Sequence, residues 1–231
     1  LVMDVKFGVA AFMTDADQAR VLAQSIVNLA GECGVKTTAL LTDMDAPLGE
    51  AAGNWLEVKE AVTCLEGAGP KDLRELVIAC ATHLPGGGAE GARAELASGR
   101  PRAKFDELLT VQGADLDAFT VKLKRDSTAS VVKEFVSSTD GFVSQCDARI
   151  IGEMVRDLGG GRLAHDSDIQ LGVGVDQLRP VGAEIQEGEV LARVHAMSQE
   201  GIDTAFGRLL EAFDISRQPP ELPVLVADVI E

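Results

Sequence analysis

The residues from Leu40 to Ala61 combine oxygen-bearing side chains with a loop that offers backbone carbonyls. The stretch reads LLTDMDAPLGEAAGNWLEVKEA: it leaves an apolar strand pattern, crosses a loop with Pro and Gly, and enters a helix at about Asn54, with Glu57 and Glu60 following. Loop carbonyls are not used by a ladder, so they are free to bind a ligand. Oxygen donors at such a corner suit a hard cation or a polar ligand. The alternative is an ordinary capped helix, with Asn54 as N-cap and the early glutamates favoured by the helix dipole.

Two strands and one helix are expected to position this corner. Residues 1–6 read as a buried strand, apolar positions at helical spacing predict a helix from Asp15 to Cys33, and Lys36 to Thr42 predicts a second strand. A strand, helix and strand in so short a span form a parallel βαβ unit. The loops Phe7–Met13 and Thr42–Gly53 should therefore meet at the carboxyl ends of the two strands.

The pattern changes along the chain from helix-rich to strand-rich. Further helices are predicted at 56–66, 70–83, 90–98 and 104–112. Beyond residue 130, Val-rich strands are predicted at 131–136, 141–145 and 183–194, with helices at 148–158 and 202–213. We predict two domains: residues 1–125 form the later part of an α/β domain with a parallel βαβ unit, and residues 126–231 form an α+β domain.

The alternating segment 182–194 predicts a β-hairpin similar to those of the barrel-sandwich biotinyl and lipoyl carriers. A carrier function is not expected, because the tip, Gln186–Glu189, has no Lys to take a prosthetic group.

Composition narrows the function classes. A net charge of −16 and a pI near 4.6 argue against a nucleic-acid or anionic-membrane surface. Cys33, Cys64, Cys80 and Cys146 form no CxxC pair, so they are interpreted as small core residues of a reducing compartment. The sequence has neither a signal-peptide pattern nor an apolar run of transmembrane length, which predicts a soluble, cytoplasmic protein. Because it opens with Leu inside a strand pattern, we expect a part of a longer protein.

Several unusual blocks together resemble the thymidine and pyrimidine-nucleoside phosphorylases. These blocks are LVMDVKFG at 1–8, KTTALLTDM at 36–44, GN at 53–54, LEVKEA at 56–61, DGFV at 140–143 and LGGGR at 158–162. They cover nearly the whole chain in order. The resemblance implies the C-terminal portion of such an enzyme, the later half of its α/β domain followed by its α+β domain.

The resemblance also implies a reaction, the reversible phosphorolysis of a pyrimidine nucleoside to free base and pentose 1-phosphate, with phosphate as co-substrate. The family's main catalytic and phosphate-binding residues match positions before Leu1, so we expect no catalytic residue in this chain and no activity from it alone. Family members are homodimers through an N-terminal helical domain that also lies upstream. The alternatives are a relative acting on another nucleoside or a nucleoside monophosphate, and a non-catalytic interaction or assembly module of the same fold.

Two site elements of the family do map onto this sequence. The family binds a potassium ion through two backbone carbonyls and one carboxylate, which match Leu48, Ala51 and Glu60. The alternative for Glu60 is a surface helix carboxylate paired with Arg or Lys. Phe12 matches a residue that lines the base pocket, and its alternative is a core aromatic beside the strand end.

Other polar motifs are given structural interpretations. Asp4 and Lys6 are predicted to form an ion pair. Gly159–Arg162 follows a helix instead of opening one, so it is predicted to be a helix stop and not an anion site. His165, beside two aspartates, is predicted to lie in a polar loop.

Overall fold

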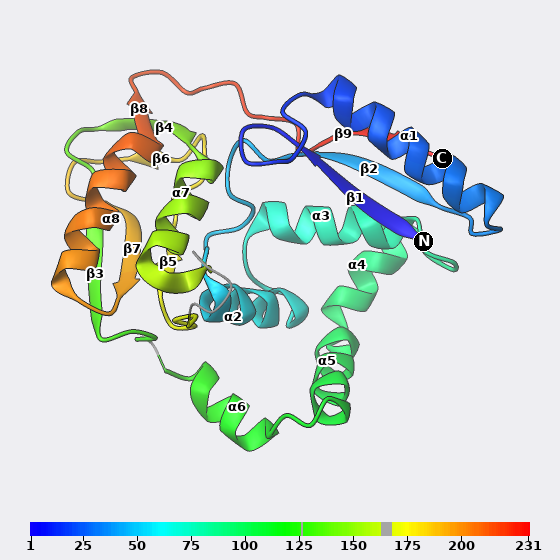
Figure 1. The fold of residues 1–231 in the computed structure, drawn as a ribbon, viewed down its shortest axis with the longest axis horizontal. Helices are drawn as coiled ribbons and strands as arrows, with labels where there is room; N and C mark the ends of the chain where they lie inside the picture. Colours follow the sequence, from blue (N-terminus) through cyan, green and yellow to red (C-terminus); the bar gives the residue numbers. More distant parts are fainter. Residues whose placement is uncertain (126, 163–167) are drawn as a thin grey trace.

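The computed structural model describes residues 1–125, 127–162 and 168–231, and within them the strands form three small sheets of three strands each. Figure 1 shows one sheet beside helix α1 and the other two sheets at the opposite end of the molecule, with helices between them. The protein is therefore a mixed α/β structure, as its sequence predicts.

The first sheet contains the predicted βαβ unit. Strands β1 (Val2–Phe7) and β2 (Thr38–Asp43) pair in parallel, from Val2 opposite Thr38 to Phe7 opposite Asp43. Helix α1 (Ala16–Glu32) connects them and begins where the Asp15 side chain accepts the Gln18 N–H at 2.9 Å. The predicted parallel pairing of the two strands is confirmed.

The third strand of this sheet comes from the far end of the chain and was not expected. Strand β9 (Val226–Ile230) runs antiparallel to β2, which gives the order β1-β2-β9. Ile230 is buried in the same core as Val5 and Leu41, and Asp228 pairs with Arg20 of α1. The last residues of the protein thus complete the core of its first sheet.

Helices fill the segment between the first sheet and the remaining two. They are α2 (Asn54–Leu65), α3 (Lys71–Thr82), α4 (Ala89–Ala97), α5 (Arg100–Val111) and α6 (Leu116–Leu123). Helix α6 was not predicted, and α5 begins earlier than expected. Within the described ranges, none of the helices has the length and apolar character needed to cross a membrane.

The interpretation of Asn54 as an N-cap is wrong. Gly53 caps α2 through its backbone, at φ 131°, and Asn54 is the first helical residue. Its side-chain amide instead donates to the Gly160 carbonyl at 2.7 Å, a contact with a distant segment that no local pattern encodes.

The C-terminal half contains two sheets on one core. Their orders are β3-β7-β5 and β6-β4-β8. The elements are β3 (Val131–Val136), β4 (Gly141–Cys146), α7 (Ala148–Val155), the π-helical turn η1 (Arg156–Gly160), β5 (Gly174–Asp176), β6 (Glu184–Ile185), β7 (Val190–Ala196), α8 (Gln199–Ala212) and β8 (Phe213–Ser216). Both sheets contribute to the core, for example Val143 from β4 and Val194 from β7, and α8 contributes Leu209.

The predicted hairpin at 182–194 is not formed. The turn exists, since the Glu189 N–H donates to the Gln186 carbonyl at 3.0 Å, but its arms enter different sheets. Strand β6 pairs with β4, whereas β7 pairs with β3 and β5. Alternation reports that a segment is a strand with one buried face, and it does not identify the neighbouring strand.

The cysteines are free, and their environments differ. Cys64 and Cys146 are buried, as predicted, and Cys80 is partly buried. The interpretation is wrong for Cys33, which follows the last turn of α1 and is exposed.

Candidate cation and ligand site

The loops at the carboxyl ends of β1 and β2 meet as expected. The Met44 N–H donates to the Phe7 carbonyl at 2.7 Å, and the Val9 N–H donates to Asp45 Oδ1 at 2.8 Å. Gly8 has φ 120°, and a Cβ at this position would lie 3.0 Å from the Asp45 nitrogen. A side chain at Gly8 would therefore force the two loops apart.

The predicted ion pair at the end of β1 is confirmed. Lys6 Nζ lies 2.9 Å from Asp4 Oδ2. Thr42 on β2 donates to Asp4 and lies 3.3 Å from Lys6 Nζ, so it joins the pair to the neighbouring strand. This arrangement ties the two strands together, which is the structural function expected of it.

Phe12 lies in the loop between β1 and α1 with 95% of its surface exposed. Its interpretation as a core aromatic is therefore wrong. Contact with a base stays a prediction, and an exposed ring on a loop at the strand ends is available for it.

Glu60 faces the loop that precedes its own helix. Its Oε1 accepts the Glu50 N–H at 2.7 Å. A Cβ on Gly49, which has φ 77°, would lie 2.8 Å from Glu60 Cδ, so the carboxyl group packs directly on the loop backbone. Among the described residues, no Lys or Arg forms an ion pair with Glu60, and the alternative of a paired surface carboxylate is wrong.

The loop around this carboxylate is held in place while its carbonyls stay available. The Gly49 N–H donates to Asp72 Oδ2 at 2.9 Å, which fixes the loop against the start of α3. Among the described residues, neither the Leu48 nor the Ala51 carbonyl accepts a hydrogen bond.

The electrostatic setting of Glu60 favours a cation. Burial is the main cause that raises the pKa of its carboxyl group to about 7; the neighbouring charges of Glu50, Asp72 and Glu57 act in the same direction, and the hydrogen bond from the Glu50 N–H acts against it. A cation beside Glu60 would relieve both effects. In the described part of the chain, no group of three or more His, Cys, Asp or Glu is arranged to hold a metal ion, so a cation here would depend on backbone oxygens. A half-buried carboxylate with two free carbonyls is a donor set that fits an alkali cation.

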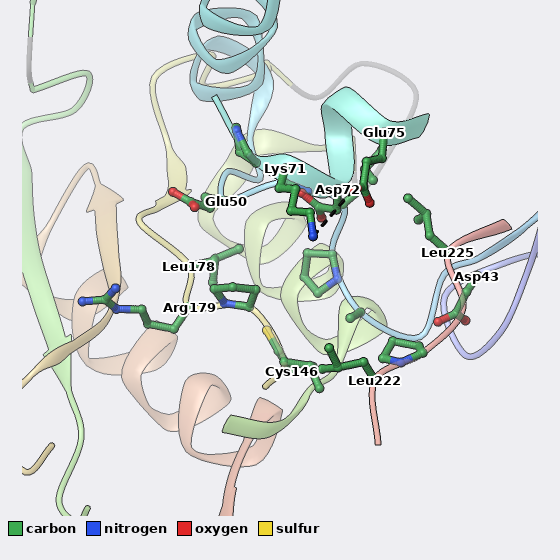
Figure 2. Close-up of a pocket in the computed structure, with 18 residues that line it drawn as sticks. Asp43, Glu50, Lys71, Asp72, Glu75, Cys146, Leu178, Arg179, Leu222 and Leu225 are labelled. Carbon is green, nitrogen blue, oxygen red and sulfur yellow. Dashed lines mark hydrogen bonds and ion pairs between the residues drawn. The ribbon is translucent and has the colours of Figure 1, made fainter. Parts of the chain in front are cut away.

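A cavity of about 360 Å³ opens beside this loop (Figure 2). Residues of the loop, including Leu48, form one wall, the start of α3 forms another, and Leu222 and Leu225 lie on the chain that returns to β9. Its lining is mostly apolar, with charged side chains at Asp43, Glu50, Lys71, Asp72, Glu75 and Arg179. Lys71 Nζ lies 3.6 Å from Glu75, so part of this charge is paired.

Sequence reasoning missed Asp72 as a partner of this loop. The sequence places this residue only at the start of the helix predicted at 70–83. Its contact with Gly49 spans 23 positions, and a helix-start signal contains no information about such a distant partner.

The glycine run after α7 forms a turn, as predicted. Gly159 has φ 94°, a non-helical conformation near the end of the turn η1, and its carbonyl accepts the Gln170 N–H at 2.8 Å. The predicted polar loop at His165 lies outside the described residues.

Two family models match the sequence, one on each half. The model described as "Glycosyl transferase family, a/b domain" matches residues 1–104. The model described as "Pyrimidine nucleoside phosphorylase C-terminal domain" matches residues 142–216.

Curated relatives match the chain over nearly all of its length. A thymidine phosphorylase of Colwellia psychrerythraea is 35% identical, with 98% of this chain and 54% of the relative covered. A pyrimidine-nucleoside phosphorylase of Geobacillus stearothermophilus is 35% identical, with coverages of 100% and 55%. A thymidine phosphorylase of Agrobacterium fabrum is 33% identical, again with 100% and 55% covered. The chain thus spans about 55% of the length of the relatives it matches.

Proposed function

Because the chain belongs to the family of thymidine and pyrimidine-nucleoside phosphorylases, we propose that it is part of a pentosyltransferase that cleaves pyrimidine nucleosides with phosphate. The observation that carries this proposal is the similarity, at about 35% identity, between 98–100% of the chain and about half of each enzyme. The two family models match in the order α/β domain and then C-terminal domain.

The proposed reaction exchanges one bond at the anomeric carbon of the sugar. The bond to the base nitrogen breaks, its electron pair leaves with the base, which takes up a proton, and a phosphate oxygen bonds to the same carbon. Such a reaction needs a held phosphate, an aligned nucleoside and groups that take up the developing charge.

We assign this chain a supporting function in that reaction. The Leu48 and Ala51 carbonyls and the Glu60 carboxylate are proposed to hold a potassium ion, which would brace the neighbouring phosphate-binding segment electrostatically. This assignment is supported by the half-buried Glu60, which forms no ion pair with a Lys or Arg among the described residues. Phe12 is proposed to contact the base, supported by its exposed position at the strand ends. No catalytic residue is assigned to this chain.

A phosphorolysis assay tests the proposal. The complete product of the encoding gene should release thymine from thymidine or uracil from uridine only when phosphate is present. The 231-residue chain by itself should release neither, because the main catalytic residues are expected outside it.

Either half of this expectation can be contradicted. Absence of phosphorolysis by the complete product would favour a non-catalytic module or a different nucleoside substrate. Phosphorolysis by the 231-residue chain alone would contradict the placement of the catalytic residues.

The finer architecture is also proposed. We place the domain division between residues 125 and 126, which is supported by family models that end at 104 and begin at 142. A barrel-sandwich arrangement of the two C-terminal sheets is supported by their single shared core. For the complete protein we propose a cytoplasmic homodimer, by analogy with the family.

A further inference from the structure

The loop between β2 and α2, residues 44–53, carries the two proposed carbonyl ligands and is called the cation loop below. It is hydrogen-bonded to the C-terminal half at strand β5 and at Leu178 just after it. The Ala52 N–H donates to the Val175 carbonyl and the Val175 N–H donates to the Ala52 carbonyl, both at 2.8 Å. The Leu178 N–H donates to the Glu50 carbonyl at 3.0 Å. Backbone bonds from the C-terminal half thus flank Ala51, whose carbonyl is a proposed cation ligand.

Two glycines bring these backbones into direct contact. Gly53 has φ 131° and Gly174 has φ 148°. A Cβ on Gly53 would lie 2.9 Å from the Gly174 Cα, and a Cβ on Gly174 would lie 3.0 Å from the Gly53 Cα and overlap the Ala52 carbonyl oxygen. Any side chain at Gly174 must therefore push β5 and the cation loop apart.

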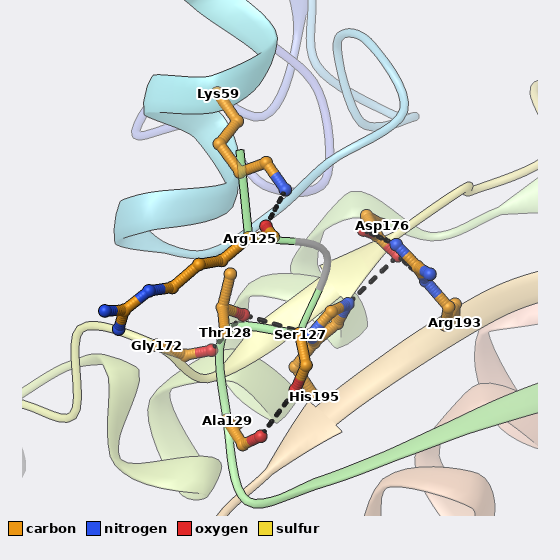
Figure 3. A network of polar contacts seen from close by, with 9 residues as sticks. All are labelled: Lys59, Arg125, Ser127, Thr128, Ala129, Gly172, Asp176, Arg193 and His195. Carbon is orange, nitrogen blue, oxygen red and sulfur yellow. Dashed lines mark hydrogen bonds and ion pairs between the residues drawn. The ribbon is translucent and has the colours of Figure 1, made fainter. Parts of the chain in front are cut away.

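Strand β5 is in turn anchored inside the C-terminal half by Asp176 (Figure 3). Arg193 of β7 donates to both carboxylate oxygens, at 2.8 and 2.7 Å, and Nε2 of the fully buried His195 lies 3.1 Å from Asp176 Oδ1. Burial opposes the ionisation of Asp176, but these contacts outweigh it and lower the pKa of the carboxyl group to about 2. These contacts attach the end of β5 to strand β7.

The same network reaches the segment that connects the two halves. His195 Nδ1 lies 3.0 Å from Thr128 Oγ1, and this hydroxyl donates to the Gly172 carbonyl at 2.6 Å. Gly172 lies two residues before Gly174, so the connecting segment is tied to the start of the same strand.

On its opposite side the loop is held by Glu60 and Asp72, which belong to helices α2 and α3. Two of the proposed cation ligands are therefore held by different parts of the protein. Glu60 lies on helix α2 of the first half, whereas the Ala51 carbonyl lies in the loop that is bonded to β5. A displacement of β5 would move one ligand relative to the other.

We propose that strand β5, through Gly174 and the Gly53–Gly174 contact, positions the cation loop, so that the C-terminal half sets the affinity of a site to which it contributes no ligand. The inference rests on the proposed function for the cation itself, but the positioning of the loop stands on the contacts alone. Gly174 and Asp176 are positioning residues.

Gly174→Ala in the full 231-residue chain is the direct test. Gly188→Ala is the matched control, because Gly188 has φ 85° in the same half but nothing lies within 4 Å of its Cβ position. If Gly174→Ala fails to fold, Asp176→Asn tests the same strand without adding volume, with Asp157→Asn, which removes an exposed ion pair with Arg156, as its control.

Two readouts are needed. Hydrogen exchange of the Gly49 and Glu50 amides reports the position of the loop, and both should exchange about tenfold faster in Gly174→Ala than in wild type or Gly188→Ala. Cation binding is measured as the increase in melting temperature when potassium chloride replaces sodium chloride at constant ionic strength. This increase should be smaller in Gly174→Ala than in wild type or Gly188→Ala.

The possible outcomes separate the inference from the proposed function. Unchanged exchange of both amides in folded Gly174→Ala or Asp176→Asn would overturn the inference. A wild-type chain with no potassium response would overturn the cation assignment, and amide exchange would still decide whether β5 positions the loop. Neither result depends on phosphorolysis.

Discussion

Glu60 has an environment that its sequence context does not predict. It lies in the second turn of a helix, where a carboxylate is ordinarily solvated, yet it packs on the Gly49 backbone and has a pKa near 7 instead of 4.5. The folded chain therefore binds this proton more tightly than the unfolded chain does.

This shift predicts a pH dependence of stability. A carboxyl group with a raised folded-state pKa stabilises the fold when protonated, so the free energy of unfolding should fall as pH rises from about 4.5 to about 7 and then level off. Glu60→Gln should remove this component and be more stable than wild type at pH 8. Urea unfolding of both proteins at pH 5 and pH 8, in potassium-free buffer, measures the difference.

Potassium provides the internal control for this prediction. A bound cation favours the ionised form, so added potassium should flatten the wild-type dependence and leave Glu60→Gln unchanged. An identical pH dependence in the two proteins would contradict the assignment of the raised pKa to Glu60.

At the scale of elements, strand β9 shows how much of the first sheet depends on the end of the chain. It pairs with the edge of β2 opposite β1, and with β9 in place the residues of β2 from Thr38 to Thr42 are buried. It also places Ile230 in the core that includes residues of α1. Neighbouring Val229 is 40% exposed on the same strand.

Truncation of these two side chains should have unequal effects. Ile230→Ala removes a buried side chain from the core and should lower the free energy of unfolding by about 2–4 kcal/mol. Val229→Ala, the matched control, should cost less than about 1 kcal/mol. Chemical denaturation of both variants measures this. Similar small effects for both would mean that β9 is not docked in solution.

At the scale of the whole molecule, the two halves are joined by backbone bonds and not only by packed surfaces. The Ala148 N–H donates to the Asp45 carbonyl at 2.9 Å, and the Trp55 N–H donates to the Leu171 carbonyl at 3.1 Å. In addition, the chain leaves the C-terminal half after β8 and returns to the first sheet as strand β9, so the two halves are covalently connected a second time. The halves should consequently unfold together.

Trp55, the single tryptophan, is a probe at this junction. We expect its fluorescence and the far-ultraviolet circular dichroism to report one coincident transition in guanidinium chloride, because unfolding either half breaks the bonds at the junction. Two separated transitions would show that the halves are energetically independent.

The sequence by itself determined the first βαβ unit, most of the helices and the family. Two apolar strand patterns and the helical spacing of the apolar positions between them, all within residues 1 to 42, predicted a βαβ unit, because the spacing of buried side chains follows the geometry of the helix that carries them. The position of Asp4 beside Lys6 predicted their ion pair, and the motif blocks identified the phosphorylase family. The expected cation ligands and the base contact of Phe12 came from the same resemblance and stay predictions.

Only the tertiary structure decided which distant segments lie together. The pairing of β9 with β2, the separation of β6 from β7 into two sheets, the contact of Asp72 with Gly49 and the approach of Gly174 to Gly53 all join residues far apart in the chain. Local propensity and periodicity report whether a face is buried. They contain no information about which surface buries it, because that choice depends on how all the elements pack at once.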